Sequence, residues 1–198
     1  MSTFDFTFDL TLENKRVELR PLAKIDIAFL LPFSLKEPAL WDYSITSAAG
    51  EEALTTYVEN ALALRNNKKG YPFLVFDKAT QQVAGSTRFY DMDFHHKTLS
   101  LGYTWYGKKF QRTGLNRQCK LLLLTFAFEK LKMERVEFRA DARNQRSLDA
   151  MKGIGCTLEG ILRNNCTSPS GRRNSAVLSI LKEEWDGGLK NKLMEKIR

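Results

Sequence analysis

One stretch, residues 99–132, most constrains what this chain can fold into. It begins with an apolar, strand-like run, passes through a polar turn that contains Gly114, and ends in an apolar segment with helical periodicity. A strand that enters a helix through such a turn leaves several backbone N–H groups unpaired at the helix N-terminus. The helix dipole favours negative charge at the same place. The stretch therefore predicts a phosphate-binding turn between a strand and a helix.

The rest of the chain predicts one α/β domain over residues 1–198. This length is enough for one well-buried core, and no repeat or linker divides it. Antiparallel strand patterns come first, then a strand–helix–strand crossover, then a helix and a final hairpin, so the central strand pair should be parallel. We expect strands at 16–19, 71–76, 82–90, 98–106, 135–140, 156–162 and 175–181, and helices at 51–64, 115–131, 144–151 and 189–197.

Three local expectations concern the first ninety residues. The alternation of Phe4, Phe6 and Phe8 with polar residues predicts a half-buried strand that continues to residue 12. Its phenylalanine face needs a cover, which makes a homodimer plausible. A helix around Asp26 should stop before Pro32, because proline breaks helices. Gly85 should mark a bulge or a close approach within a strand.

Charge and cysteine usage narrow the class of protein. The net charge of +8 is compatible with an anionic partner, such as a phosphorylated cofactor, a nucleic acid, an acidic protein or a membrane surface. Because the basic residues are spread along the chain, an ordinary solvated surface is the favoured explanation. Cys119, Cys156 and Cys166 are odd in number and lack Cys-x-x-Cys spacing, which fits reduced cytoplasmic thiols. With no signal-peptide pattern and no membrane-spanning run, we expect a cytoplasmic protein without a membrane partner.

Three other site types are disfavoured. His95 and His96 stand near two aspartates, but neighbouring residues on a strand point to opposite faces and no other histidine exists, so no metal site is expected. Residues 102–108 have the spacing of a nucleotide P-loop, yet Lys109 follows where a hydroxyl residue would hold magnesium. No Gly-x-Gly-x-x-Gly dinucleotide fingerprint is present.

The turn at residues 111–116 resembles the acyl-CoA pyrophosphate loop of the GNAT N-acetyltransferase superfamily, Gln/Arg-x-x-Gly-x-Gly/Ala, from which Asn116 departs. Residues 17–22, 101–105, 144–147, 159–163 and 184–185 are similar to the RimJ/RimL-like branch. The resemblance implies a GNAT fold: a mixed, mostly antiparallel central sheet, flanked by helices, in which strands 99–106 and 135–140 splay apart. It also implies that pantetheine inserts between those two strands.

The resemblance implies an acetyl-CoA-dependent N-acetyltransferase that acts on a primary amine of a small molecule or of a peptide or protein N-terminus. Ser147 matches a family serine near the sulfur, and its hydroxyl would donate to the leaving thiolate; the alternative is an ordinary helix-face serine. Asn144 would bind the pantetheine arm and also cap its helix. The residues implied to bind the acyl donor are Tyr103, Thr104, Trp105, Gln111, Arg112, Thr113, Gly114, Leu115, Asn116 and Asn144.

No residue matches a general base. Ser100, Met151 and Cys166 occupy positions where relatives carry acid or base groups. Glu159 is the remaining acid in a matching motif, and it reads equally well as a half-buried structural carboxylate paired with Arg163 or Arg139. Deprotonation of the acceptor would then go through water.

Two alternatives to the enzyme stay open at this point. One is a CoA-binding protein of the same fold without useful catalysis. The other is a basic RNA-binding or ribosome-binding module, which lacks support because no strand interleaves aromatic and basic residues. We therefore expect no specific nucleic-acid partner. The acceptor should enter from the side of the first two helices, near Trp41, Asp42 and Tyr43.

Overall fold

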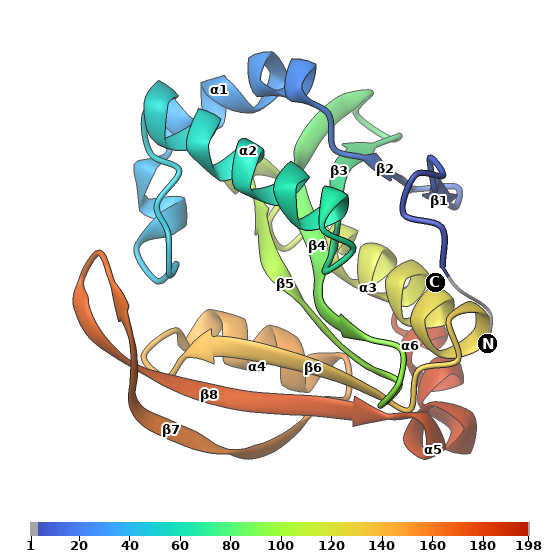
Figure 1. Cartoon of the computed structure of the whole chain (residues 1–198). Helices are drawn as coiled ribbons and strands as arrows, with labels where there is room; N and C mark the ends of the chain where they lie inside the picture. Colours follow the sequence, from blue (N-terminus) through green and yellow to red (C-terminus); the bar gives the residue numbers. More distant parts are fainter. Residues whose placement is uncertain (1–3, 198) are drawn as a thin grey trace.

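The computed structural model describes residues 4–197, which fold around one eight-stranded sheet (Figure 1). The order across the sheet is β1-β2-β3-β4-β5-β6-β8-β7, and only the β5–β6 pair is parallel. This confirms the mixed α/β sheet with a central parallel pair. The strands are β1 (Leu12–Glu13), β2 (Val17–Pro21), β3 (Tyr71–Asp77), β4 (Gln82–Asp93), β5 (Thr98–Tyr106), β6 (Arg135–Asp141), β7 (Thr157–Ser168) and β8 (Gly171–Leu181).

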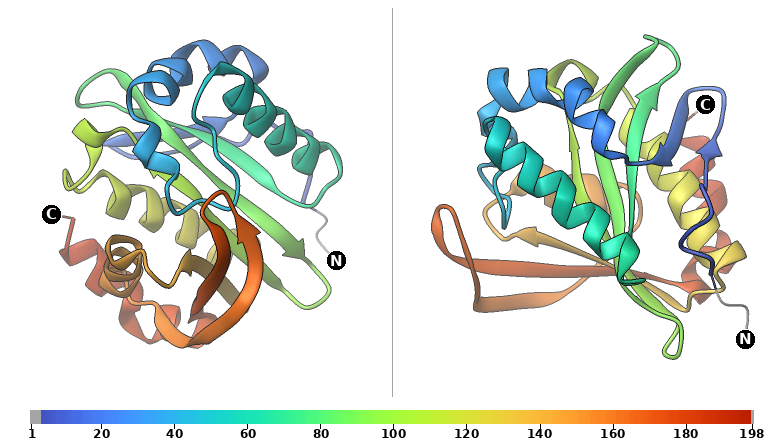
Figure 2. Two further views of the ribbon diagram at one scale, coloured as in Figure 1. Left: turned by 90° about the vertical axis from the view of Figure 1, so that its left-hand side faces the viewer. Right: turned by 45° about the horizontal axis from the view of Figure 1, so that its top comes forward.

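Helices cover both faces of the sheet (Figure 2). The apolar residues of α2 recur at helical spacing and pack with α1 around Leu74 and Trp105 on one face. Helix α3 packs on the other face against Phe89 and Val136. The α-helices are α1 (Ile27–Lys36), α2 (Glu51–Asn66), α3 (Leu115–Thr125), α4 (Gln145–Gly153), α5 (Lys182–Glu184) and α6 (Lys190–Glu195). Shorter helical turns are η1 (Lys24–Asp26), η2 (Pro38–Trp41), η3 (Lys108–Phe110), η4 (Phe126–Lys130) and η5 (Trp185–Leu189).

The parallel pair splays, as the family resemblance implies. Strands β5 and β6 pair only from Thr98↔Arg135 to Ser100↔Glu137. Beyond that point β6 continues alongside β8 as far as Asp141. The edge of β5 that faces β6 is therefore unpaired over residues 101–106. The two strands diverge beyond this point (Figure 1), and we call the region between them the cleft.

Two irregularities shape β4 and β5. The register places Ser86 opposite Trp105 and Arg88 opposite Gly102, so two residues of β5, at 103 and 104, face one residue of β4. This bulge lies on the unpaired stretch of β5. Gly85 confirms its predicted role, because a Cβ atom there would lie 2.0 Å from the Trp105 carbonyl oxygen.

The N-terminal segment is not the predicted strand, and only residues 12 and 13 pair with β2. The backbone before them bonds to side chains instead: the Tyr71 hydroxyl donates to the Phe8 carbonyl at 2.6 Å, and Arg65 Nε donates to the Phe6 carbonyl at 2.7 Å. Phe6 is buried, Phe4 packs beside it, and Phe8 is 63% exposed. The chain thus covers most of the phenylalanine face itself, which removes the reason for expecting a homodimer; light scattering would test that expectation.

The prediction that the first helix stops before Pro32 is also wrong. Helix α1 runs to Lys36 with Pro32 inside it. Leu30 and Ser34 on either side of the proline are buried, and the Ser34 hydroxyl donates to the Ala48 carbonyl at 2.6 Å. Tertiary packing and this side-chain bond therefore outweigh the lost backbone hydrogen bond. In the part of the chain that is described, no helix is long and apolar enough to span a membrane.

Candidate active site

The turn before α3 has the geometry of an anion-binding loop. Gly114, the N-cap residue of α3, has a φ of +85°, a left-handed conformation that favours glycine. Two side-chain bonds hold the turn: Gln111 Nε2 donates to the Tyr106 carbonyl and Thr113 Oγ1 to the Phe110 carbonyl, both at 2.8 Å. Within residues 4–197, the N–H groups at positions 112, 113 and 114 find no acceptor. Three fixed, unpaired donors at a helix N-terminus suit a phosphate.

Helix α4 joins this turn from the far side of the cleft. Arg146 Nη1, in its first turn, donates to Gln111 Oε1 at 2.8 Å. Asn144 is the N-cap, and its Oδ1 accepts from the Ser147 N–H at 3.1 Å, which confirms the predicted cap. The Ser147 hydroxyl is half-buried and has no hydrogen-bond partner in the described chain. The first turn of α4 therefore presents a free hydroxyl and a guanidinium beside the loop.

The bulge of β5 links the cleft to the α2 face of the sheet. Tyr103 has a φ of +49°, and its carbonyl accepts from the Tyr57 hydroxyl at 3.1 Å. The Arg88 guanidinium lies 4.1 Å from the centre of the Tyr103 ring and 4.6 Å from that of Tyr57. Arg88 is 3% exposed, and its Nε and Nη2 atoms have no acceptor among the described residues. Sequence reasoning missed Arg88 and Tyr57, because only the strand register and the α2 packing bring them to the bulge.

A lysine that sequence reasoning also missed lies between the diverging strands. Lys120, on the inner face of α3, is 5% exposed, and its Nζ donates to Thr104 Oγ1 at 2.8 Å. The ring of Phe138, on β6, lies 5.8 Å from the same Nζ. Burial lowers the pKa of this ammonium to about 8. Lys120 belongs to no sequence motif. A lysine on the apolar face of an expected helix could nevertheless have indicated a buried functional group.

The residues at the expected base positions supply no carboxylate. Ser100 is buried beside Tyr90, and burial raises the pKa of the Tyr90 hydroxyl to about 12. Met151 is buried, and Cys166 contacts the Ser175 hydroxyl at 4.0 Å. None of these three positions therefore provides a carboxylate that could take a proton from the acceptor amine.

Two neighbouring glutamates are engaged by arginine. Glu137, the register partner of Ser100, accepts from Arg135 at 2.9 Å through one oxygen and from Arg139 at 2.6 Å through the other. Glu159 pairs with Arg135, not with Arg163 or Arg139 as expected, because the register of β6, β8 and β7 brings Arg135 beside it. The Arg135 hydrogen bonds hold the pKa of Glu159 at about 2, and 40% of the side chain is exposed. Neither carboxylate suits a general base.

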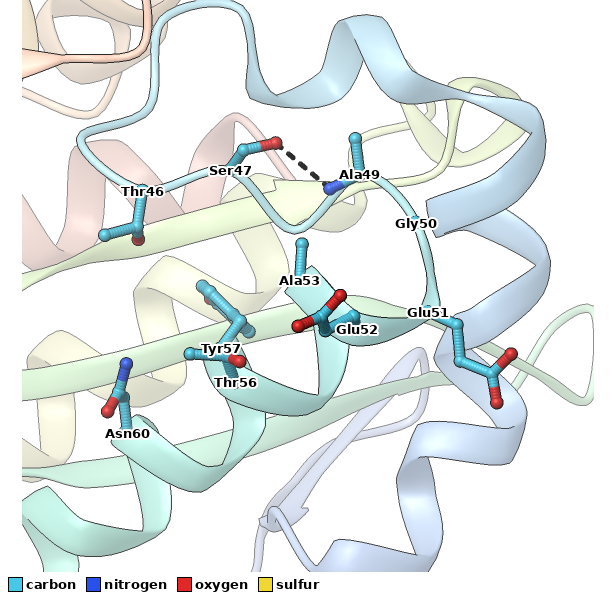
Figure 3. A pocket seen from close by; sticks show the side chains of 10 residues that line it. All are labelled: Thr46, Ser47, Ala49, Gly50, Glu51, Glu52, Ala53, Thr56, Tyr57 and Asn60. Carbon is cyan, nitrogen blue, oxygen red and sulfur yellow. Dashed lines mark hydrogen bonds between the residues drawn. The ribbon is translucent and has the colours of Figure 1, made fainter.

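A hollow of about 600 Å³ lies on the α2 side of the bulge. The loop residues Thr46 and Ser47 stand across it from Thr56 and Asn60 of α2, as Figure 3 shows. Tyr57, whose hydroxyl donates to the Tyr103 carbonyl of the bulge, also lines the hollow. Trp41, expected to face the acceptor, is instead buried in the core beside Trp105. Among the described residues no group of histidine, cysteine and carboxylate side chains could hold a metal ion.

Residues 16–157 match the family described as the acetyltransferase (GNAT) domain. The chain belongs to the GNAT acetyltransferase family. It is 29% identical over 105 residues to a Bacillus subtilis (strain 168) protein provisionally named ribosomal N-acetyltransferase YdaF; the alignment covers 53% of this chain and 57% of YdaF. The crystal structure of a provisionally named acetyltransferase from T. thermophilus is 33% identical, with a TM-score of 0.86, covering 96% of this chain and 98% of that one.

The ribosomal-protein acetyltransferase RimL, solved in complex with coenzyme A, shares the fold at 18% identity, with a TM-score of 0.76 and coverage of 88% and 99% of the two chains. The similarity to YdaF supports the RimJ/RimL-like branch. GNAT acetyltransferases use acetyl-CoA as the acyl donor. The site fits that donor on two observations. Three unpaired N–H groups at the N-terminus of α3 suit a diphosphate, and the unpaired edge of β5 offers backbone partners to an amide-containing arm.

Proposed function

We propose that this chain transfers the acetyl group of acetyl-CoA to a primary amine of a small molecule or of a peptide or protein N-terminus. The observation that carries the proposal is the unpaired edge of β5, which runs from the anion-binding turn to the bulge. When bound, acetyl-CoA supplies an activated acetyl thioester. The names of the relatives YdaF and RimL favour a ribosomal or other protein N-terminus among the acceptors.

In this proposal each side of the cleft has its own task. The backbone N–H groups at residues 112–114 bind the diphosphate, with Gln111, Leu115 and Asn116 shaping the turn. The backbone of residues 103–105 pairs with the pantetheine arm and donates to the thioester carbonyl oxygen. Asn144 and Ser147 face the arm from α4.

The acceptor enters from the hollow on the α2 side. Glu51 and Glu52 line this hollow and attract a cationic amine or a basic peptide. In the described part of the chain no free carboxylate lies at the bulge, so the amine loses its proton to water and attacks in the neutral form. The rate should therefore rise with pH until the amine of the acceptor is deprotonated.

Thiol release from acetyl-CoA, with mass spectrometry of the products, tests the proposal. A panel of small primary amines and of peptides with free N-termini is offered, and the same peptides with blocked N-termini serve as controls. We expect at least one free amine to gain an acetyl group with matching thiol release. Donor binding without thiol release across the panel would favour the non-catalytic CoA-binding protein instead.

A further inference from the structure

The inference concerns Lys120 and rests on the function proposed above. Its ammonium is buried at the point where β5 and β6 diverge, and within residues 4–197 it forms no salt bridge. Burying an unpaired cation costs free energy of folding. Its presence at this site therefore points to a role in function. We propose that Lys120 is a catalytic residue, which stabilises the departing thiolate of coenzyme A and returns a proton to it.

A hydrogen bond holds the lysine against the bulge of β5. A lysine ammonium only donates, so Thr104 Oγ1 accepts from Lys120 at 2.8 Å, and the same oxygen lies 2.7 Å from Thr87 Oγ1 and 3.4 Å from the Gly102 carbonyl oxygen. Thr104 belongs to the bulge on the unpaired edge of β5. One N–H of Lys120 is thereby fixed, and the other two have no acceptor among the described residues. The Phe138 ring of β6 lies 5.8 Å from Nζ, so the ammonium is held between β5 and β6.

Among residues 4–197, no anionic group compensates the charge on Lys120. The titratable groups that face it are the thiols of Cys119, on its own helix, and of Cys156, just before β7. Burial raises the pKa of both thiols to about 12, so both are neutral at physiological pH. The thiolate that leaves during acyl transfer is the anion that would pair with this ammonium. Met151, on α4, occupies a position where relatives carry an acid or base group, and it cannot donate a proton. Lys120 supplies the proton donor instead.

The proton balance of the step is complete. The acceptor nitrogen forms a bond to the acetyl carbon, the carbon–sulfur bond breaks, and the sulfur keeps the electron pair. Lys120 Nζ transfers one proton to that sulfur and becomes neutral, while the acylated nitrogen releases one proton to water. Water then protonates Lys120 again, so no other reactant is needed.

The test needs coenzyme A alone, because its thiolate absorbs ultraviolet light and its ionisation is followed by a pH titration. The wild type is compared with Lys120→Met, with Lys120→Gln, which keeps a donor to Thr104, and with Lys130→Met, an exposed lysine beyond α3. A cation within about 4–6 Å lowers the pKa of an anionic group by about 1–3. We expect the bound thiol to ionise at least about one pH unit lower in the wild type and Lys130→Met than in both Lys120 variants.

A rate measurement complements the titration. Once an acceptor is found, Lys120→Met should reduce kcat about 100-fold or more, as for loss of a general acid, with less change in the KM of acetyl-CoA. Identical thiol titrations in the wild type and Lys120→Met would overturn the inference while leaving the proposed function intact. Failure of coenzyme A to bind the wild type would instead refute the proposed function.

Discussion

Replacing Lys120 with methionine should make the protein more stable at neutral pH. Burial lowers the pKa of Lys120 from 10.5 to about 8. At about 1.36 kcal/mol per pH unit, keeping this ammonium buried below pH 8 costs about 3 kcal/mol. Methionine fills a similar volume but loses the hydrogen bond to Thr104, worth about 1 kcal/mol. We therefore expect a net gain of about 2 kcal/mol in the free energy of unfolding.

The pH dependence identifies the cause. A lysine whose folded pKa is lowered loses its proton in the folded chain first, so the unfolded chain binds more protons between pH 8 and 10.5. Wild-type stability should rise relative to Lys120→Met across that window, and the advantage of the variant should shrink. Below pH 8 the advantage is constant, because the lysine is protonated in both states.

Urea unfolding of the wild type, Lys120→Met and Lys130→Met at pH 7 and at pH 10 measures these differences. For a chain of this size, about 2 kcal/mol corresponds to roughly 4–8 °C in melting temperature. The exposed Lys130→Met should stay within about 0.5 kcal/mol of the wild type. The reasoning is refuted if Lys120→Met is less stable than the wild type by the same amount at both pH values.

Substitutions at three further positions test the scaffold of the site. Gly85→Ala places a Cβ atom 2.0 Å from the Trp105 carbonyl oxygen of β5, so chemical denaturation should show a loss of about 1–3 kcal/mol; an unchanged midpoint would contradict this close approach. Asn144→Ala should cost about 1 kcal/mol through the lost N-cap, whereas Asn144→Asp should keep most of it, and equal losses would argue against capping. Glu159→Gln should cost less than about 1 kcal/mol at pH 7 by calorimetry, because the carboxylate that pairs with Arg135 is 40% exposed, and a loss above about 2 kcal/mol would contradict this.

The elements around residues 99–132 could be predicted because local pattern and tertiary environment agree there. β5 spans the predicted residues 98–106, Gly114 marks the start of α3, and Asn144 caps α4. The strand prediction for the N-terminal segment was wrong because local pattern and tertiary environment differ there. Alternating phenylalanines also occur in an irregular segment whose backbone bonds to the Tyr71 and Arg65 side chains. Periodicity reports which side chains are buried, and it does not report what their backbone pairs with.

The anion-binding turn could be located from sequence, whereas the centre of the cleft could not. The turn is continuous in the chain, so its glycine and its flanking elements indicate it locally. Arg88 and Lys120 reach the bulge from β4 and α3, and only the register of β4 with β5 and the inward face of α3 bring them there. The partner of Glu159 likewise depends on a register across three strands.

Isothermal titration with acetyl-CoA tests the central claim most directly, with Gly114→Glu as the perturbation and Gly187→Glu as its control. Position 114 lies in the turn, whereas Gly187 is an exposed glycine in η5 with open space around it. A carboxylate in the turn should repel the diphosphate. We predict binding of one acetyl-CoA per chain in the wild type and Gly187→Glu, and at least about ten-fold weaker binding in Gly114→Glu. Absence of binding at high micromolar acetyl-CoA, or equal binding by all three proteins, would contradict the account.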